Sequence, residues 1–419
     1  MSEAKEGLWT VMVYMVGDAG LDYNGFTDLK EMKLAGSTDE VALLAQFCRG
    51  VKNRPTKRYH LTKDSRDGTL ASDVIEDLGE TDPASPETVA EFFRWGIEKF
   101  PARHYMAVLW GHGNGANDET LPNLVIPSAT EDAQGMETVQ VRRRVLNSPQ
   151  TRAIVISPSS AAFDAYSLDS LDCRRFQKAL KLVSVPLGRK LDILGMDSCV
   201  MSGAEVCYQI RDSVRLMVAA EGSGPVDGWP YDKVLGALVE NPTMKPETLA
   251  TTIAENFVAS YADCEDLSVT QSVCDLDKCD LLASSIDRLA ETLIAKLIDD
   301  EAKKPIMLAR FQVQAYENTE YIDLYDFCGL LREHSHDEEI RTACGDVMEV
   351  ISSRGFVLKA LYQSDAMQYS YGLSIYFPLH EVSRAYERLD IARDTRWVIF
   401  LKEYLGKIRR PNRGEVQRI

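Results

Sequence analysis

The feature that most constrains the fold is a series of short, nearly uninterrupted apolar runs. They occupy residues 8–16, 41–47, 105–110 and 191–194, and a further strand is predicted over residues 215–221. Apolar residues at consecutive rather than alternating positions are typical of strands buried on both faces of a parallel sheet. Segments with helical spacing lie between several of these runs, so the sequence predicts a doubly wound α/β sheet.

The intervening segments carry helix signals of their own. The clearest start is at Ser85 and Pro86, where serine can cap the helix and proline occupies its first position. Residues 89–100 then present one apolar face. We expect helices over residues 21–34, 86–100, 168–182, 201–211, 246–262 and 279–298, a strand over 269–276, and a short polar edge strand over 58–63.

The last third of the chain differs in character. From about residue 300 onward the segments are mainly helical and charged, with one late apolar strand ending at Pro378. The sequence therefore predicts an α/β domain over residues 1–280 and a mainly helical region over 281–419. That helical region is expected to contribute the strand 373–378 to the core.

A thiol lies at one of the predicted strand ends. The strand beginning at Leu191 breaks at Gly195 and places Asp197, Ser198 and Cys199 just before a predicted helix. The carboxyl ends of strands are where α/β sheets carry their chemistry. A helix N-terminus also favours a thiolate, which predicts that the pKa of Cys199 is lowered toward neutrality.

A histidine has the same position on another strand. The run 105–110 ends in Gly111-His112-Gly113, and glycines there allow a tight turn and close approach of a substrate. If both strands belong to one parallel sheet, His112 and Cys199 meet at the same edge. The two residues then form a Cys–His dyad, with the imidazole accepting and donating the proton.

Each residue also has a structural interpretation. Most cysteines of a soluble protein are small buried hydrophobes, and position alone does not separate Cys199 from these. A histidine in a glycine-rich loop can cap a helix or bind an ion. The pairing of two strand-end residues with complementary chemistry favours the functional interpretation.

Composition excludes several classes of function. A formal net charge of −17 argues against nucleic-acid binding, which requires a basic face, and is compatible with attracting cationic substrates. No apolar run reaches the roughly 18 residues of a transmembrane helix, so no membrane association is expected. The first residues lack the apolar segment of a signal peptide, which favours a cytoplasmic protein, or a secreted one if the N-terminus has been trimmed.

The nine cysteines are odd in number and scattered, as is typical of a reducing compartment. The closest pair, Cys274 and Cys279, has no CxxC spacing and no neighbouring histidine. We therefore expect no zinc site, and the chemistry of a Cys–His dyad requires no metal or cofactor.

Four blocks of sequence together resemble the clostripain family of cysteine peptidases. They are AVLWGHGNG at 107–115, LDILGMDSCVMSGAEVCYQI at 191–210, GWPYD at 228–232 and GLSIYFP at 372–378. The likeness extends from about residue 8 to residue 378. It implies a caspase-like, mostly parallel sheet flanked by helices, related to caspases, legumains and gingipains, and cleavage of protein or peptide substrates after basic residues.

The residues leave two roles open for Asp197, which lies two positions before Cys199. It could orient the dyad as a third member or form the floor of a specificity pocket. The resemblance implies the second role, and a carboxylate ~4 Å from a guanidinium gains about 4 kcal/mol at intermediate dielectric before desolvation. The resemblance also matches Asp227 to a second acidic pocket position. Backbone N–H groups of Gly113 and Cys199 are the expected oxyanion hole.

The segment 115–165 is long, polar and weakly periodic. Since the family matures by cleavage into two chains, its arginines predict a self-processing site, although they could equally lie in a solvated loop without a role. They are Arg142, Arg143, Arg144 and Arg152.

Two further points stay open at this stage. The resemblance links the family to calcium, but the sequence has no EF-hand loop, and Asp18 or Asp22 as ligands would be arbitrary choices. A caspase-like binding or scaffolding module with little turnover is the alternative to a peptidase. The sequence makes no prediction of oligomeric state.

Overall fold

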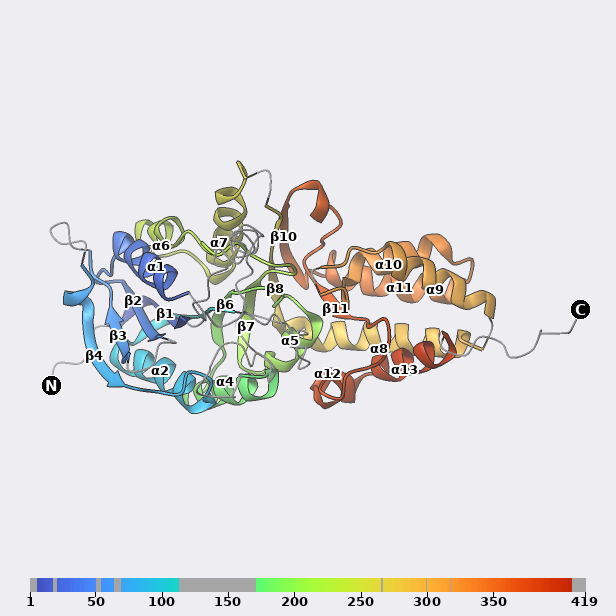
Figure 1. Cartoon of the computed structure of the whole chain (residues 1–419), viewed down its shortest axis with the longest axis horizontal. Helices are drawn as coiled ribbons and strands as arrows, with labels where there is room; N and C mark the ends of the chain where they lie inside the picture. Colours follow the sequence, from blue (N-terminus) through green and yellow to red (C-terminus); the bar gives the residue numbers. More distant parts are fainter. Residues whose placement is uncertain are drawn as a thin grey trace, which may run out of the picture.

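A computed structural model of the chain describes residues 6–17, 21–49, 54–63, 69–112, 171–264, 267–298, 300–316 and 318–408. Its centre is a nine-stranded sheet with the order β10-β8-β7-β6-β5-β1-β2-β3-β4 (Figure 1). The strands are β1 (Gly7–Gly17), β2 (Val41–Arg49), β3 (Thr56–His60), β4 (Val74–Gly79), β5 (Ala102–Trp110), β6 (Leu191–Asp197), β7 (Val214–Ala219), β8 (Val269–Asp275) and β10 (Val357–Gln363).

The central strands β2, β1, β5, β6 and β7 pair in parallel, and the outer strands pair antiparallel. This mixed, mostly parallel α/β sheet confirms the predicted fold class. The prediction that residues 58–63 form an edge strand is wrong, because β4 pairs with the outer side of β3. The sequence did not predict β4, because the residues of this strand alternate between half-buried and exposed positions and form no apolar run.

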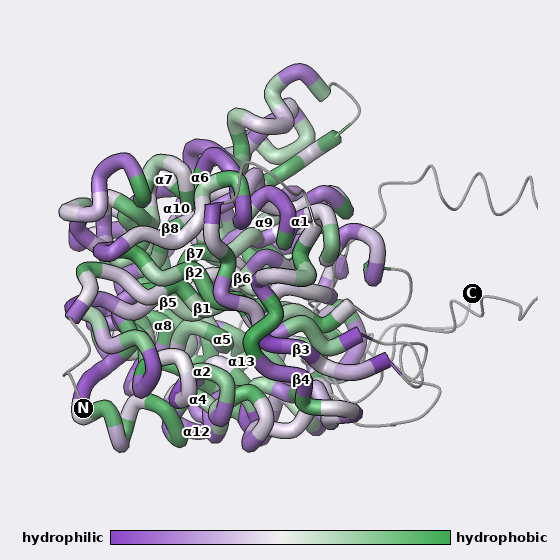
Figure 2. The backbone as a smooth tube through the Cα atoms, turned by 90° about the vertical axis from the view of Figure 1, so that its left-hand side faces the viewer, coloured by the Kyte–Doolittle hydropathy of each residue, from purple (hydrophilic) through white to green (hydrophobic). Residues whose placement is uncertain are grey.

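Helices cover both faces of the sheet (Figure 1). The sequence of β1 is apolar at consecutive positions because both faces of the strand are buried. Val11 and Val13 belong to the apolar cluster on one face, and Met12 and Tyr14 belong to the cluster on the other. The hydrophobic colouring of Figure 2 accordingly concentrates on the inner strands. One face carries α1 (Asp22–Ala35), α6 (Tyr231–Glu240) and α7 (Pro246–Ser260), and the other carries α2 (Pro86–Lys99), α4 (Cys173–Leu187), α5 (Ala204–Ile210) and α8 (Cys279–Lys296).

The remaining helices gather at one end of the sheet, on the right in Figure 1. They are α9 (Asp300–Gln312), α10 (Leu324–His334), α11 (Glu338–Ile351), α12 (Asp390–Asp394) and α13 (Trp397–Ile408). Short 3-10 turns lie at Ala71–Asp73, Leu276–Lys278, Asp365–Met367 and Tyr386–Arg388. This arrangement agrees with the prediction that the last third of the chain is mainly helical.

The late apolar strand is buried in the core but lies outside the large sheet. It forms β11 (Ser374–Tyr376) and pairs antiparallel with β9 (Tyr321–Asp323) in a two-stranded sheet. The C-terminal region instead adds β10, which the sequence did not predict, to the edge of the large sheet. The domain division near residue 280 stays a prediction, since one apolar cluster contains residues from both sides of it.

This C-terminal region also braces the chain that follows β6. Ser374 N donates to Ser202 O at 2.9 Å, and Ser202 Oγ donates to Gly372 O at 2.8 Å. The segment after Cys199 is therefore held from behind by residues that lie some 170 positions further along the chain.

Across the described ranges, no helix combines the length and the apolar character needed to cross a membrane.

We predict that the C-terminal region depends on Trp397. Its side chain is 0% exposed, its ring packs edge-on against Phe377 with centroids 5.9 Å apart, and its Nε1 donates to Tyr376 O at 2.9 Å. Trp397→Ala should lower the free energy of unfolding in urea by about 3–5 kcal/mol. Ile399→Ala, at a 47% exposed position of the same helix, should change it by less than about 0.5 kcal/mol. Equal losses in the two variants would contradict this packing.

Candidate active site

The register of two neighbouring parallel strands sets the site. In β5 and β6 the last paired residues are Trp110 and Asp197, and Gly111 N donates to Asp197 O at 3.4 Å just beyond them. His112 and Cys199 each follow two residues after that last pair. The structure therefore brings both predicted residues to the same carboxyl edge, on adjacent strands, as the sequence predicts.

The turn after β5 needs a glycine. Gly111 has φ 145°, which L side chains rarely adopt, so the chain can leave the strand sharply at this point. His112 follows directly and is half-buried.

The turn after β6 is built differently. Val200 has φ 57°, which is uncommon for a β-branched residue and costs about 1–3 kcal/mol. Its N–H donates to Gly222 O at 3.0 Å, which helps to hold the reversed backbone. Strain of this kind, immediately after a candidate nucleophile, is typical of functional sites.

Cys199 itself is buried, with 1% of its surface exposed. Its Sγ accepts a hydrogen bond from Gly224 N at 3.2 Å. Helix α5 begins only at Ala204, later than predicted, so the expected helix N-terminus does not lie directly beside the thiol. A backbone N–H of the loop after β7 donates to the sulfur.

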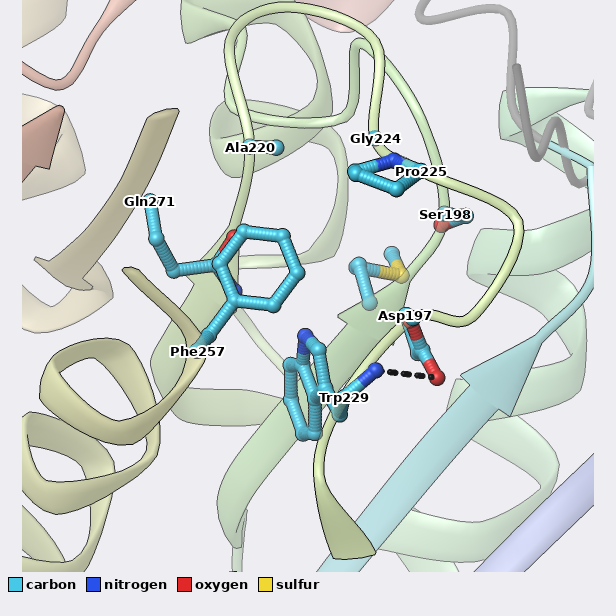
Figure 3. A pocket seen from close by; sticks show the side chains of 10 residues that line it. Asp197, Ser198, Ala220, Gly224, Pro225, Trp229, Phe257 and Gln271 are labelled. Carbon is cyan, nitrogen blue, oxygen red and sulfur yellow. Dashed lines mark hydrogen bonds between the residues drawn. The ribbon is translucent and has the colours of Figure 1, made fainter. Parts of the chain in front are cut away.

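The same loop holds Asp197, whose side chain is also buried. Asp197 Oδ2 accepts a hydrogen bond from Trp229 N at 3.4 Å (Figure 3). It accepts a second one from Tyr231 Oη at 3.1 Å. Both donors are neutral groups, and they orient the carboxylate. Residues that follow β7 therefore contact both Cys199 and Asp197 directly.

A hollow of about 240 Å³ opens beside these residues. Its walls combine apolar surface with one acid at Asp197. It is lined by Met196, Asp197, Ser198, Ala220, Gly224, Pro225, Gly228, Trp229, Phe257 and Gln271 (Figure 3).

Other predicted site residues are not brought to this hollow. Asp227 is exposed on the turn that Gly228 N closes onto Pro225 O at 3.1 Å, and it does not line the hollow. Its role in a pocket stays a prediction. Gly113 and the four arginines at 142, 143, 144 and 152 lie outside the described residues.

Sequence reasoning missed several residues that shape the site. Trp229 and Tyr231 lie within the GWPYD block, so the resemblance pointed to the segment but not to their contacts with Asp197. Gly224 contacts Cys199 from 25 residues away, and Val200 has a strained backbone. No local pattern signals either feature.

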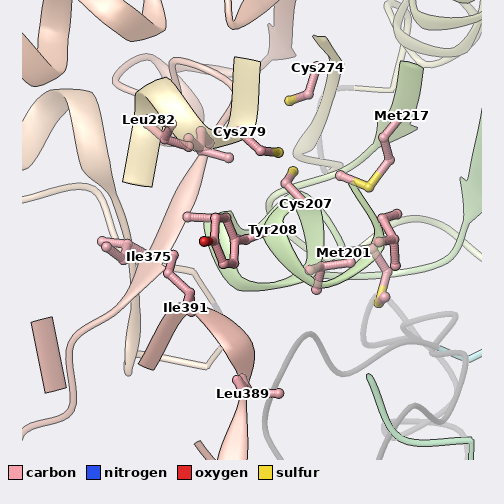
Figure 4. Packing of buried hydrophobic residues seen from close by; sticks show 14 of the residues in the cluster. Met201, Cys207, Tyr208, Met217, Cys274, Cys279, Leu282, Ile375, Leu389 and Ile391 are labelled. Carbon is pink, nitrogen blue, oxygen red and sulfur yellow. The ribbon is translucent and has the colours of Figure 1, made fainter. Parts of the chain in front are cut away.

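The other cysteines behave as ordinary core residues. All nine cysteines are free, and Cys264 is the one that is not fully buried. Figure 4 shows Cys207, Cys274 and Cys279 turned toward one another within the apolar cluster. Burial raises the pKa of both Cys207 and Cys279, which keeps those thiols protonated and unreactive.

The described residues do not fit a calcium site. Among them, no three His, Cys, Asp or Glu side chains gather where they could hold a metal ion. Of the two acids considered from the sequence, Asp18 lies outside the described ranges, and Asp22 forms an ion pair with Arg49. We therefore derive no catalytic step through a metal.

Similar folds occur among solved cysteine proteases. One is a secreted C11 cysteine protease from Bacteroides thetaiotaomicron, with 16% identity and a TM-score of 0.65. Another is an inactive zymogen C11 protease from Parabacteroides distasonis, with 19% identity and a TM-score of 0.60. Each alignment covers 93% of this chain and 99% of the other. At these identities the likeness shows the fold, which is that of caspase-like cysteine peptidases.

The family follows from the sequence. The model of the clostripain family matches residues 13–142 and 147–404, which is nearly the whole chain. The chain belongs to the clostripain family and is a cysteine-type peptidase. No curated protein matched it.

We predict that Gly195 is required by the packing of Trp229. A Cβ added at Gly195 would lie 2.6 Å from Trp229 Cη2 and 3.3 Å from Val108 Cγ2. Gly195→Ala should therefore lower the free energy of unfolding by about 1–3 kcal/mol, measured in urea.

The matched control is Gly236→Ala, because an added Cβ there meets nothing within 4 Å inside helix α6. That variant should be unchanged or more stable by up to about 1 kcal/mol. A Gly195→Ala protein as stable as the Gly236→Ala protein would contradict the packing.

Proposed function

We propose that the chain hydrolyses peptide bonds with Cys199 as the nucleophile and His112 as its acid–base partner. The observation that carries this proposal is the register of β5 and β6, which pairs Trp110 with Asp197. His112 lies two residues after Trp110, and Cys199 lies two residues after Asp197. Adjacent parallel strands are about 4.8 Å apart, so residues at the same offset are neighbours. The two side chains supply the residue types that a cysteine peptidase requires.

The reaction then follows from ordinary acyl-transfer chemistry. His112 takes the proton of the Cys199 thiol, and the sulfur attacks the peptide carbonyl to form a tetrahedral oxyanion. His112 returns that proton to the leaving amine as the C–N bond breaks and a thioester forms. Water then attacks the thioester, releases the acid product and regenerates the thiol.

Backbone N–H groups stabilise the charges in this sequence. The Gly224 N–H, 3.2 Å from Sγ, favours negative charge on the sulfur before attack. We assign the oxyanion to the N–H groups of Gly113 and Cys199, and one such donor is typically worth about 10²–10³ in rate.

We propose a preference for arginine, and secondarily lysine, before the scissile bond. Asp197 is buried, lies two residues before Cys199 and lines the hollow beside it. A cationic side chain entering this hollow meets a carboxylate oriented by Trp229 and Tyr231. Asp227, exposed on the same loop, is the candidate for a second, weaker acidic contact.

We also propose that the chain is self-processed between residues 115 and 165. Cys199 is 1% exposed, as expected of a site that is not open to substrate. A similar fold is that of a protein described as an inactive zymogen. Arg142, Arg143, Arg144 and Arg152 would suit the proposed basic preference.

The proposal also covers the location of the enzyme, its substrates and its need for a metal. The similar Bacteroides proteins are described as secreted, which favours the secreted alternative over a cytoplasmic location for this chain. We propose protein or peptide substrates with basic residues and no metal in the reaction. Oligomeric state is left open.

Replacing the nucleophile tests the proposal most simply. Cys199→Ala should reduce the hydrolysis of a fluorogenic arginyl peptide by at least about 10³, because the general base then has no thiol to activate. Cys264→Ala removes the one cysteine that is not fully buried and should leave the rate within about twofold. Hydrolysis that survives in Cys199→Ala would remove this cysteine from its role. Absence of turnover in the wild-type chain, before and after limited proteolysis, would favour the scaffolding alternative.

The specificity is tested with two substrates that differ only in charge. Peptides with arginine or its neutral isostere citrulline before the scissile bond should differ in kcat/KM by at least about 10², since a buried carboxylate close to a guanidinium discriminates by several kcal/mol. In Asp197→Asn the arginyl rate should fall while the citrulline rate changes little. If Asp197→Asn keeps the wild-type ratio of the two rates, Asp197 is not the recognition residue.

A further inference from the structure

Two carboxyl groups lie in contact behind Cys199, and the mechanism above uses neither. Glu221 lies two residues after the end of β7, Asp323 ends β9, and both are fully buried. Asp323 Oδ2 and Glu221 Oε2 accept hydrogen bonds from the consecutive backbone N–H groups of Tyr371 and Gly372, which places the two carboxyl groups side by side. Two ionised carboxylates have no donor to share, so this contact requires one proton between them.

The remaining contacts of Glu221 fix its side chain in one position. Oε1 accepts a hydrogen bond from Tyr316 Oη at 2.7 Å, and Oε2 accepts one from Gly372 N at 2.9 Å. Tyr316 Oη also lies 3.1 Å from Ser370 Oγ, which gives this phenol a second partner. The carboxyl group of Glu221 is thus anchored on the C-terminal region.

Asp323 is fixed in the same way. Oδ1 accepts from Asp326 N at 2.7 Å and thereby caps helix α10, and Oδ2 accepts from Tyr371 N at 2.6 Å. Since these donors are backbone N–H groups of a helix start and of the 370–372 turn, Asp323 offers Glu221 a rigid support.

The backbone that carries Glu221 leads directly to the nucleophile. Glu221 N and Gly222 N both donate to Thr270 Oγ1, at 3.0 and 3.1 Å. Gly222 O accepts from Val200 N, and Gly224 N donates to Cys199 Sγ. Residues 221–224 therefore connect the carboxyl pair at one end to the sulfur at the other.

We propose that Glu221 is a positioning residue for catalysis: by sharing one proton with Asp323 it fixes residues 221–224 and keeps the Gly224 N–H against Cys199 Sγ. This inference rests on the proposed role of Cys199 as nucleophile. Loss of the shared proton places two negative charges in contact, which favours movement of Glu221 and of the loop attached to it.

The electrostatics of the pair agree with the geometry. Burial, the largest cause, raises the pKa of Glu221 from 4.5 to about 7. Burial and then the charge of Glu221 raise the pKa of Asp323 well above its usual value. The titratable groups facing the pair are the Tyr316 phenol, the Cys274 thiol of β8, Asp326 and Cys328 of α10, and Tyr371.

The sign of the pH dependence follows. The folded chain keeps a proton that the unfolded chain releases above its usual pKa of 4.5. The contribution of Glu221 to stability is therefore complete below about pH 4.5 and is lost as the pH rises through about 7. Asp323, whose pKa is raised well above its usual value, keeps the last proton of the pair to higher pH, so the positioning of residues 221–224 should weaken as the pH rises beyond about 7.

The test compares Glu221→Gln with the wild type. The amide is a neutral isostere of the protonated acid: it can donate to Asp323 and accept from Gly372 N, while Tyr316 turns its proton toward Ser370. We expect kcat of Glu221→Gln to match the wild type near about pH 5.5, and the ratio of the two kcat values to rise roughly fivefold by about pH 8.5. KM should change little, and the exposed control Glu240→Gln should show a flat ratio.

A second pair of measurements separates positioning from stability alone. Glu221→Ala should lose roughly tenfold or more in kcat at every pH, a loss that Glu221→Gln rescues. Where Glu221→Ala does not fold, the Glu221→Gln comparison stands by itself. Unfolding in urea should show a pH dependence between about pH 4.5 and 7 in the wild type that is reduced in Glu221→Gln.

Two results would overturn the inference. One is a ratio of kcat values that stays flat with pH while the pH dependence of unfolding changes, since the pair would then stabilise the fold without positioning the loop. The other is wild-type kcat in a folded Glu221→Ala protein. Activity that survives in Cys199→Ala would instead overturn the proposed function, whereas the unfolding measurement does not depend on Cys199.

Discussion

The parallel hydrogen-bond ladder between β5 and β6 is the interaction on which the rest of the site depends. It pairs Trp110 with Asp197 and so fixes the positions of the residues that follow each strand. His112 and Cys199 are far apart in the sequence, and their approach is a consequence of this register. A shift of one residue would turn each side chain to the opposite face and separate the thiol from the imidazole.

A second set of polar contacts holds the turn after β6, and so fixes the position of Cys199. Gly224 N and Gly222 O hold the turn that contains Cys199 and the strained Val200. Behind this turn, Ser202 is bonded to Gly372 and Ser374, which belong to the last quarter of the chain. The helical region at the end of the sheet is therefore part of the support of the site. Its removal would leave buried polar groups of the turn after β6 unpaired, at about 1–3 kcal/mol each.

Much of the fold was predictable because its strands are buried on both faces. The runs 8–16, 41–47, 105–110 and 191–194 are apolar at consecutive positions, and each became a strand of the parallel centre. Strands that lack this burial were missed. β4 and β10 lie at the sheet edges with half-exposed residues, and charged residues interrupt their apolar positions.

The candidate site likewise contains residues that the sequence predicts and contacts that it does not. His112 and Cys199 were predictable because strand ends, glycines and residue type combine in short blocks of sequence. Contacts such as Gly224 to Cys199, or Glu221 to Asp323, join residues from separate elements through tertiary structure alone. The helix start was also misplaced, since three further residues precede α5 after Val200 and the turn has no helical pattern to mark it.

The most direct test of the central claim is to locate a covalent label. A peptide ending in arginyl acyloxymethyl ketone alkylates the nucleophilic sulfur of a cysteine peptidase, and mass spectrometry of the digested protein identifies the modified residue. We predict a single label on Cys199, lost in His112→Ala and in Asp197→Asn. A label on another cysteine, or equal labelling by a probe with a neutral side chain in place of arginine, would contradict the account.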